Sequence, residues 1–335
     1  MRQQPQKIHL AFAVAMMCGL AAQAAADPSY TTIDPPGSIY TTARNINHGW
    51  IAGYYQTSQG NYGGFVRAPD GTLSPFDVPD VTNTFGAAVD KNGNVTGFAG
   101  GGGFDHGFVR AADGTVTTFD APGSASTVGL SINNGMVTGF YDDANFVAHG
   151  FVRDRKGNIT NFDPAGSTYT SPDYVNQYGQ VVGSYQTSDG LTHAFLRAPD
   201  GTFTTFDLPG SIWTAPVCIN KQGEITGLWY DADSNIHGFL RTPDGVLTSF
   251  DAAPRSNGTQ GMSINNHGRI AGLYFDKNNI QHGFTRSLKG HITRFDPPGS
   301  SYTTVESIDS GEDHGAIVGE YADANFMFHG FLRTP

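Results

Sequence analysis

Short apolar runs separated by polar turn residues fill the chain after its N-terminal segment. Four such runs follow one another in each unit, as in SIWTAPVCIN, EITGLWY, IHGFLR and VLTSFD. The runs alternate apolar and polar positions or are rich in β-branched and aromatic residues, as strands are. Between them, NKQG and PDG supply the Asn, Asp and Gly that accept the positive φ of tight hairpins. No later stretch has a helical period, so the pattern predicts an all-β fold.

The four-run unit recurs seven times along the chain. The Asp of the FDxPGS motif returns every 43 to 45 residues, at Asp34, Asp77, Asp120, Asp163, Asp207, Asp251 and Asp296. A period of this length with four strands per copy is typical of a β-propeller blade. The sequence therefore predicts a seven-bladed β-propeller with four antiparallel strands per blade.

The two ends of the repeat region are out of phase. SYTTID at the start corresponds to the fourth strand of a unit, whereas HGFLRTP at the end is a third strand. The N-terminal strand would then complete the last blade, which removes exposed sheet edges and joins the ends of the chain. We expect one domain over residues 27–335 that closes in this way, with a β-solenoid as the alternative.

The N-terminal segment has the anatomy of a secretory signal peptide. Arg2 and Lys7 precede an apolar run over residues 8–22, and small residues at 24–26 lie before Asp27. The run is too short and wrongly flanked for a transmembrane span. We therefore predict a signal peptide at residues 1–26 and a mature protein that is secreted or periplasmic.

The charge balance is strongly acidic. The chain has 19 Lys and Arg against 30 Asp and Glu, and loss of Arg2 and Lys7 with the signal peptide leaves 17 against 30. Such a surface repels phosphate backbones, so nucleic acid is excluded as a partner. No later segment is apolar enough to span a bilayer. Only Cys218 remains after processing, so we expect no intramolecular disulfide and a fold stabilised by packing. The expected oligomeric state is a monomer.

The repeat resembles the HAF-type extracellular repeat, named for a His-Ala-Phe tripeptide. The tripeptide occurs here as His193-Ala194-Phe195 and elsewhere as His-Gly-Phe, and the resemblance extends from about Ser29 to Pro335. It implies an exported bacterial repeat protein. It implies no reaction, ligand or catalytic residue.

The histidines of this motif form one column, and Gly63 replaces the histidine in the first copy. Its members are His106, His149, His193, His237, His282 and His329. Residues spread around a ring cannot share one metal ion, because each His–Zn bond is only about 2.0 Å long. We expect each imidazole to satisfy an Asp or a main-chain carbonyl within the scaffold. A threonine column and the FD and PGS residues are likewise predicted to bond strands and turns, with each Asp bonding its own turn.

A site used once in a repeat protein should lie where the copies differ. The residue before the conserved Thr of each first run reads Tyr40, Asn83, Ser126, Tyr169, Trp213, Gly258 and Tyr302. Four aromatic rings near one end of a central channel are predicted to stack on sugar rings or hold an apolar ligand. Packing between blades is an equally suitable role for Tyr40, Tyr169, Trp213 and Tyr302.

A second variable column lies further along the same run. It reads Arg44, Ala87, Leu130, Asp173, Val217, Met262 and Glu306. Ring closure would make Glu306 and Arg44 neighbours, able to form an ion pair or position a polar substrate. Glu306, Asp173 and Arg44 are therefore the candidate catalytic residues, since a carboxylate with a shifted pKa acts as a general acid or base. Solvated channel charges are the alternative.

Acidic loops between the second and third runs are candidate metal sites. Asp142, Asp143, Asp231, Asp233 and Asp323 lie near Asn145, Asn235 and Asn325, and copy seven adds Asp309, Glu312 and Asp313. These oxygens suit calcium, but no loop has the twelve-residue EF-hand spacing. We predict no metal site and no cofactor, with calcium as the weaker alternative.

Motifs of common catalytic folds are absent from the sequence, which has no GxSxG, HExxH or GxxxxGK[ST]. We therefore predict a non-catalytic propeller that binds a carbohydrate, a peptide or another cell-envelope component. Whether it is an enzyme stays open. The alternative function is that of a lyase or hydrolase acting on a polysaccharide or lactone in the central channel, by analogy of fold. A third possible function is that of a surface or spore-coat component, whose repeats would serve assembly alone.

Overall fold

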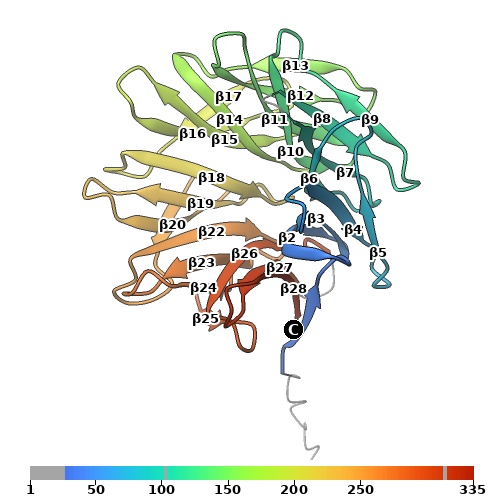
Figure 1. The fold of residues 1–335 in the computed structure, drawn as a ribbon. Coiled ribbons are helices and arrows are strands. Elements are labelled where there is room, and N and C mark those ends of the chain that lie inside the picture. The colour runs from blue at the N-terminus through green and yellow to red at the C-terminus, as the bar shows by residue number, and fades with distance from the viewer. Residues whose placement is uncertain (1–26, 102–103, 312–314) are drawn as a thin grey trace, which may run out of the picture.

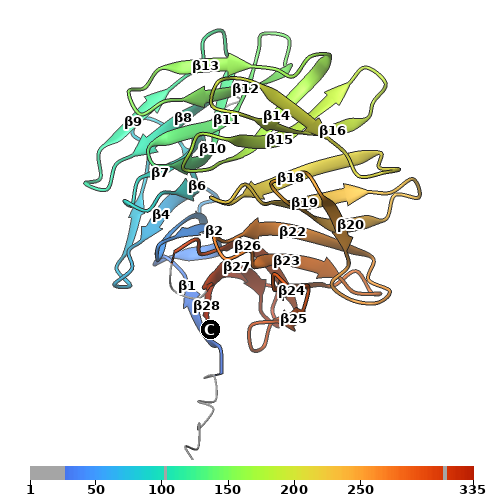
Figure 2. The same ribbon diagram turned by 180° about the vertical axis from the view of Figure 1, so that it is seen from behind.

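The computed structural model describes residues 27–101, 104–311 and 315–335, and the predicted signal peptide at residues 1–26 lies outside these ranges. Throughout them the regular secondary structure is β-strand. Within the described chain, seven sets of four antiparallel strands stand around a common axis (Figures 1 and 2). The predicted all-β propeller is confirmed, and the seven sets of four strands are consistent with the predicted number of blades. No helix able to cross a membrane is found in the described part of the chain.

Each blade is a meander of four strands. The innermost strands are β2 (Ser38–Asn47), β6 (Asn83–Val89), β10 (Ser126–Asn133), β14 (Ser167–Val175), β18 (Trp213–Ile219), β22 (Gly258–Ile264) and β26 (Tyr302–Ile308). The second strands are β3 (Trp50–Thr57), β7 (Val95–Gly100), β11 (Met136–Asp142), β15 (Val181–Thr187), β19 (Ile225–Tyr230), β23 (Ile270–Phe275) and β27 (Ile317–Ala322).

The two outer positions complete each blade. The third strands are β4 (Tyr62–Arg67), β8 (Asp105–Arg110), β12 (Ala148–Arg153), β16 (Thr192–Arg197), β20 (Ile236–Arg241), β24 (Gln281–Arg286) and β28 (Phe328–Thr334). The fourth strands are β1 (Ser29–Ile33), β5 (Leu73–Phe76), β9 (Val116–Phe119), β13 (Ile159–Phe162), β17 (Phe203–Phe206), β21 (Leu247–Phe250) and β25 (Ile292–Phe295). Blades are numbered 1 to 7 from the one that contains β2.

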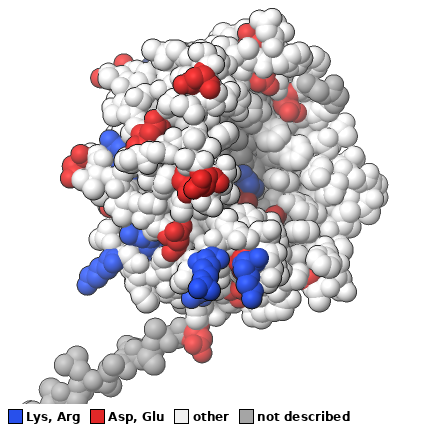
Figure 3. Space-filling view, turned by 90° about the vertical axis from the view of Figure 1, so that its left-hand side faces the viewer, with Lys and Arg blue, Asp and Glu red and all other residues white. Residues whose placement is uncertain are grey.

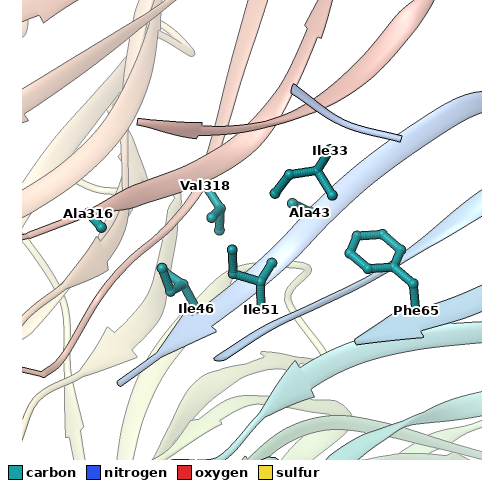
Figure 4. Packing of buried hydrophobic residues seen from close by; sticks show 7 residues of the cluster. All are labelled: Ile33, Ala43, Ile46, Ile51, Phe65, Ala316 and Val318. Carbon is teal, nitrogen blue, oxygen red and sulfur yellow. The ribbon is translucent and has the colours of Figure 1, made fainter. Parts of the chain in front are cut away.

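The N-terminal strand completes blade 7, as the phase of the repeat predicts. β1 pairs antiparallel with β28, from Ser29 opposite Thr334 to Ile33 opposite Gly330. Figure 4 shows the core at this closure, where Ile33 lies close to side chains from blades 1 and 7. That cluster comprises Ile33, Ala43, Ile46, Ile51, Phe65, Ala316 and Val318. The predicted solenoid alternative is thereby wrong, because the first and last strands of the described chain lie in one sheet.

Aromatic rings and guanidinium groups of the repeat join adjacent blades. The Phe of the His-Gly-Phe motif is fully buried in every copy, and Phe108 meets Phe76 of the preceding blade edge-on with ring centroids 5.8 Å apart. Arg110 lies over the same Phe76 ring at 5.1 Å. The Arg–Phe stacking recurs at every following junction up to Arg333 over Phe295. A cation over an aromatic face is attracted by the ring quadrupole, so one motif supplies both packing and electrostatic attraction.

The histidine column pairs with the aspartates of the FD motif. The Nδ1 atoms lie 2.7 to 2.9 Å from Asp oxygens in six pairs: His106–Asp120, His149–Asp163, His193–Asp207, His237–Asp251, His282–Asp296 and His329–Asp34. The structural role predicted for these histidines is confirmed. The sequence predicts that each Asp of the FD motif bonds its own turn, but in these six pairs its carboxyl instead contacts the third-strand histidine. Asp163 and Asp296 also accept hydrogen bonds from the hydroxyls of Thr170 and Thr303.

The strand order gives the ring two distinct faces. The loop face carries the links between blades and the loops between second and third strands, at residues 58–61, 143–147, 188–191, 231–235, 276–280 and 323–327. The turn face carries the turns that leave the first and third strands. There, Asn and Asp residues bond the next blade, as when Asn220 Nδ2 donates to the Asn265 carbonyl at 3.0 Å and His48 N donates to Asp309 Oδ1 at 2.6 Å. The sequence did not reveal this role.

Candidate functional site

A β-bulge in each innermost strand directs the side chains of the second variable column, such as Arg44 and Asp173, into the channel. In each innermost strand the pairing with the second strand shifts by one residue at this column, as between Ala43 and Asn45 and between Pro172 and Tyr174. The skipped residue, such as Arg44 or Asp173, is the extra residue of a β-bulge, which redirects its side chain. Glycine lies opposite the bulge in the second strand because a Cβ there would meet a main-chain oxygen, at 2.3 Å in the case of Gly183.

These bulge residues surround a cavity of about 120 Å³ in the channel, here named the channel cavity. Its lining comprises Arg44, Asn45, Ala87, Ala88, Leu130, Asp173, Tyr174, Val217, Cys218, Met262, Ser263, Glu306 and Ser307. The three candidate catalytic residues Arg44, Asp173 and Glu306 therefore border one space. Their sequence-based placement in the channel agrees with the structure.

Arg44 and Glu306 form the ion pair that ring closure predicts. Arg44 Nη1 lies 2.8 Å from Glu306 Oε2, and the Glu306 side chain is only 9% exposed. Burial raises the pKa of the Glu306 carboxyl, and the Arg44 guanidinium opposes that shift. Because the pair joins β2 to β26, it fastens blade 1 to blade 7 from the channel side.

Asp173 has a different environment from Glu306. No ion pair or hydrogen bond of its carboxyl is found within the described ranges, and its counterparts in the neighbouring blades are Leu130 and Val217. Burial among such side chains raises the pKa of Asp173 to about 8. A carboxyl of this kind in a cavity is a candidate functional group, because desolvation favours its neutral form near neutral pH.

A larger cavity of about 480 Å³ opens between blades 4 and 5 and is named the interblade cavity. Its lining comprises Tyr169, Ser171, Asp173, Ser184, Gln186, Thr192, Trp213, Ala215, Val217, Leu228 and Tyr230. Tyr169 and Trp213 are each 43% exposed, which is unusual for rings of this size. Asp173 and Val217 line both cavities, so the two spaces adjoin at these two residues.

Several residues of this cavity were missed in the sequence. Tyr230 pairs across the strands with Trp213, and their ring centroids are 6.0 Å apart. Ser184, from the second strand, lies opposite Ser171. A signal was present, because the residue after the second-strand glycine varies between copies as Tyr54, Phe98, Phe140, Ser184, Leu228, Leu273 and Glu320.

The structure separates Tyr40 and Tyr302 from the interblade cavity. Both rings pack against Phe328, with centroids 5.6 and 5.9 Å away. The Tyr40 hydroxyl donates to Glu320 Oε2 at 2.6 Å, and burial raises the pKa of this phenol. The four predicted aromatic residues thus divide into two pairs: Tyr169 and Trp213 line the interblade cavity, whereas Tyr40 and Tyr302 pack against Phe328.

The acidic loops are stabilised by their own main chains. Asp143 Oδ1 accepts hydrogen bonds from the amides of Asn145 and Val147 at 2.8 and 2.9 Å, and Asp323 repeats this arrangement. Bonds to main-chain amides lower the pKa of both carboxyls. No cluster of three or more His, Cys, Asp or Glu side chains suited to a metal occurs in the described part of the chain. Glu312 and Asp313 of the proposed calcium loop lie outside it.

Figure 3 views the left-hand side of Figure 1, where the loop face lies. Acidic side chains are scattered around a central hollow on this face, basic side chains also lie on its lower and left parts, and one basic side chain is visible inside the hollow.

Solved structures with the same fold include enzymes. This chain is similar to a catalytically inactive virginiamycin B lyase from Staphylococcus aureus with quinupristin, with TM-score 0.61 and 12% identity. The similarity covers 92% of this chain and 100% of the lyase chain. The β-propeller domain of the trilobed protease from Pyrococcus furiosus has TM-score 0.63 and 8% identity over 88% of this chain and 95% of the domain. Puromycin hydrolase has TM-score 0.62 and 11% identity over 89% of this chain and 53% of the hydrolase.

These similarities establish the β-propeller fold of the chain. Identities this low carry no activity or ligand from one protein to another. No protein-family model matches the chain, and no curated protein sequence matches it. The resemblance to HAF-type repeats therefore stays a prediction.

Proposed function

We propose that this propeller is an exported, non-catalytic module that binds a carbohydrate of the cell envelope in the interblade cavity. The supporting observation is the 480 Å³ cavity itself, where exposed rings of Tyr169 and Trp213 stand beside polar side chains. Aromatic faces stack on the apolar faces of sugar rings, and a few convergent polar groups fix the orientation.

The distribution of exposed apolar side chains also favours the loop face for binding. Those near this face are Ile39, Phe104, Phe146, Tyr169, Leu191, Ile212, Trp213, Ile280, Phe326 and Met327. Those near the turn face are Tyr178, Val246 and Leu288. Exposed apolar surface concentrated on one side of a molecule is typical of an interaction surface.

Glycan-array screening of the purified protein, followed by calorimetry on the best ligand, tests this function. The double variant Tyr169→Ala/Trp213→Ala should bind at least about tenfold more weakly, since each lost stacking contact costs about 1 kcal/mol. Tyr178→Ala is the matched control, because Tyr178 is 58% exposed on the opposite face. Equal affinity of the double variant and the parent would exclude the interblade cavity as the binding site.

A second function, as a lyase or hydrolase of a polysaccharide or lactone, is favoured by Asp173. Its carboxyl has no partner in the described structure and its pKa of about 8 is suited to proton transfer. Glu306 is less suited, because Arg44 already neutralises it. Turnover of such a substrate that is unchanged in both Asp173→Asn and Glu306→Gln would exclude these carboxyls as its acid or base.

A further inference from the structure

We infer that the interblade cavity binds the protonated amine of an amino sugar, with the Asp173 carboxylate as its counterion. This inference deepens the proposed function by naming the class of carbohydrate. It rests on the charge of the cavity lining, the arrangement of the rings and the unused hydroxyl groups.

Asp173 is the one formally charged residue in the lining of the interblade cavity, as the structure describes it. The Arg44 guanidinium borders the adjoining channel cavity but is held by Glu306 at 2.8 Å. A carboxylate removed from bulk water is stabilised chiefly by a nearby cation. Since the described chain places none at Asp173, a ligand cation would fill this role.

The aromatic lining favours the same ligand charge. Tyr169, Trp213 and Tyr230 border the cavity, and the Trp213 and Tyr230 rings are inclined at 54° with centroids 6.0 Å apart. An ammonium group within about 6 Å of such a ring face is attracted by the ring quadrupole. Rings and carboxyl therefore select for positive charge together.

Hydroxyl groups in the lining indicate a sugar in preference to a simple amine. The side-chain hydroxyls of Ser171, Ser184 and Thr192 make no hydrogen bond within the described structure, although Ser184 and Thr192 are only 7% and 6% exposed. A hydroxyl donates and accepts, so these groups match the alternating donors and acceptors of a pyranose. The carboxyl, the rings and the hydroxyls together match a protonated hexosamine.

Calorimetric titration at pH 6 with a glucosamine tetramer and with its fully N-acetylated counterpart tests the inference. The free amine should bind at least about tenfold more tightly, because it forms a charge-assisted contact that the acetamide cannot form. Asp173→Asn should abolish this preference. Asp233→Asn is the control, since it removes an exposed carboxylate of the loop face outside the cavity lining.

Proton release provides a measurement on the unaltered protein. With a pKa of about 8, Asp173 is protonated in the free protein at pH 6 and must ionise when it binds an ammonium group. Titrations in buffers of different ionisation enthalpy should therefore show about one proton released per amine bound. Equal affinity for the two tetramers would overturn the inference.

The outcomes separate this inference from the proposed function. Equal binding of both tetramers that depends on Tyr169 and Trp213 would support a carbohydrate site and overturn the amine preference. No binding of any glycan would contradict the proposed function as well. Tetralysine serves as a third ligand, and tighter binding of this peptide than of the glucosamine tetramer would overturn the assignment to a sugar.

Discussion

Asp173 shows how one residue changes the chemistry of a repeated wall. Most of its counterparts are apolar, namely Ala87, Leu130, Val217 and Met262. The same bulge that directs those side chains into the channel places a carboxyl among them. Because the described structure places no cation at this position, ionisation of Asp173 destabilises the folded protein.

The stability of the protein should therefore depend on the Asp173 proton. An unfolded Asp has a pKa of about 3.9, whereas burial raises the pKa of Asp173 to about 8. Between these values the folded state binds the additional proton, so this contribution to stability decreases as pH rises from about 4 to 8.

Urea unfolding of Asp173→Asn at pH 4 and pH 9 measures that dependence. The variant should match the parent at pH 4 and exceed it by about 2 kcal/mol at pH 9, where only the parent carries a buried charge. Part of the carboxyl borders the channel, which limits the expected difference. A constant difference between the two proteins at both pH values would contradict the raised pKa.

Among the elements, β2 and β26 are joined by the pair of Arg44 and Glu306. Glu306 is nearly inaccessible, whereas Arg44 is 41% exposed towards the channel. Loss of one partner therefore has unequal consequences. A buried carboxylate without a cation is costly, but a partly exposed guanidinium is still hydrated.

Thermal and urea unfolding of two single variants test this asymmetry. Arg44→Met should lower the free energy of unfolding by about 3 kcal/mol, since it leaves Glu306 unpaired. Glu306→Gln should lower it by only about 1 kcal/mol, because an amide oxygen still accepts a hydrogen bond from Arg44. Equal losses in the two variants would show that burial of Glu306 is energetically unimportant.

The order of the elements could be predicted from the sequence, because each copy repeats the same four strands and turn residues. The ion pair of Arg44 and Glu306 also followed, since it depends only on closure and on equal positions in two copies. The interblade cavity could not be predicted from the sequence. Its volume depends on how two blades pack, and Tyr230 reaches it from a second strand, outside the first-strand columns that predict the channel residues.

The ring of blades as a whole depends on a strand from the far end of the chain. β1 supplies the fourth strand of blade 7 and buries Ile33, which is 2% exposed, in the closure core. Deletion of residues 29–33 should lower the free energy of unfolding by about 3 kcal/mol or more, through the lost core side chain and the unpaired main chain of β28.

Urea unfolding and light scattering of this deletion variant measure both effects. Self-association should increase, since β28 would become an open sheet edge. Thr31→Lys is the control, because Thr31 is exposed within an intact β1. A deletion variant as stable and monodisperse as the control would show that the ring holds without this strand.

The register of β1 and β28 has a consequence for how the molecule can be displayed. Ser29 and Thr334 are paired, and both strands have these ends at the turn face. The interblade cavity opens between blades 4 and 5, separated from blade 7 by blade 6, and lies near the other face. A tether fused to residue 29 or 334 would thus attach to the turn face and leave the interblade cavity on the face directed away from the attachment.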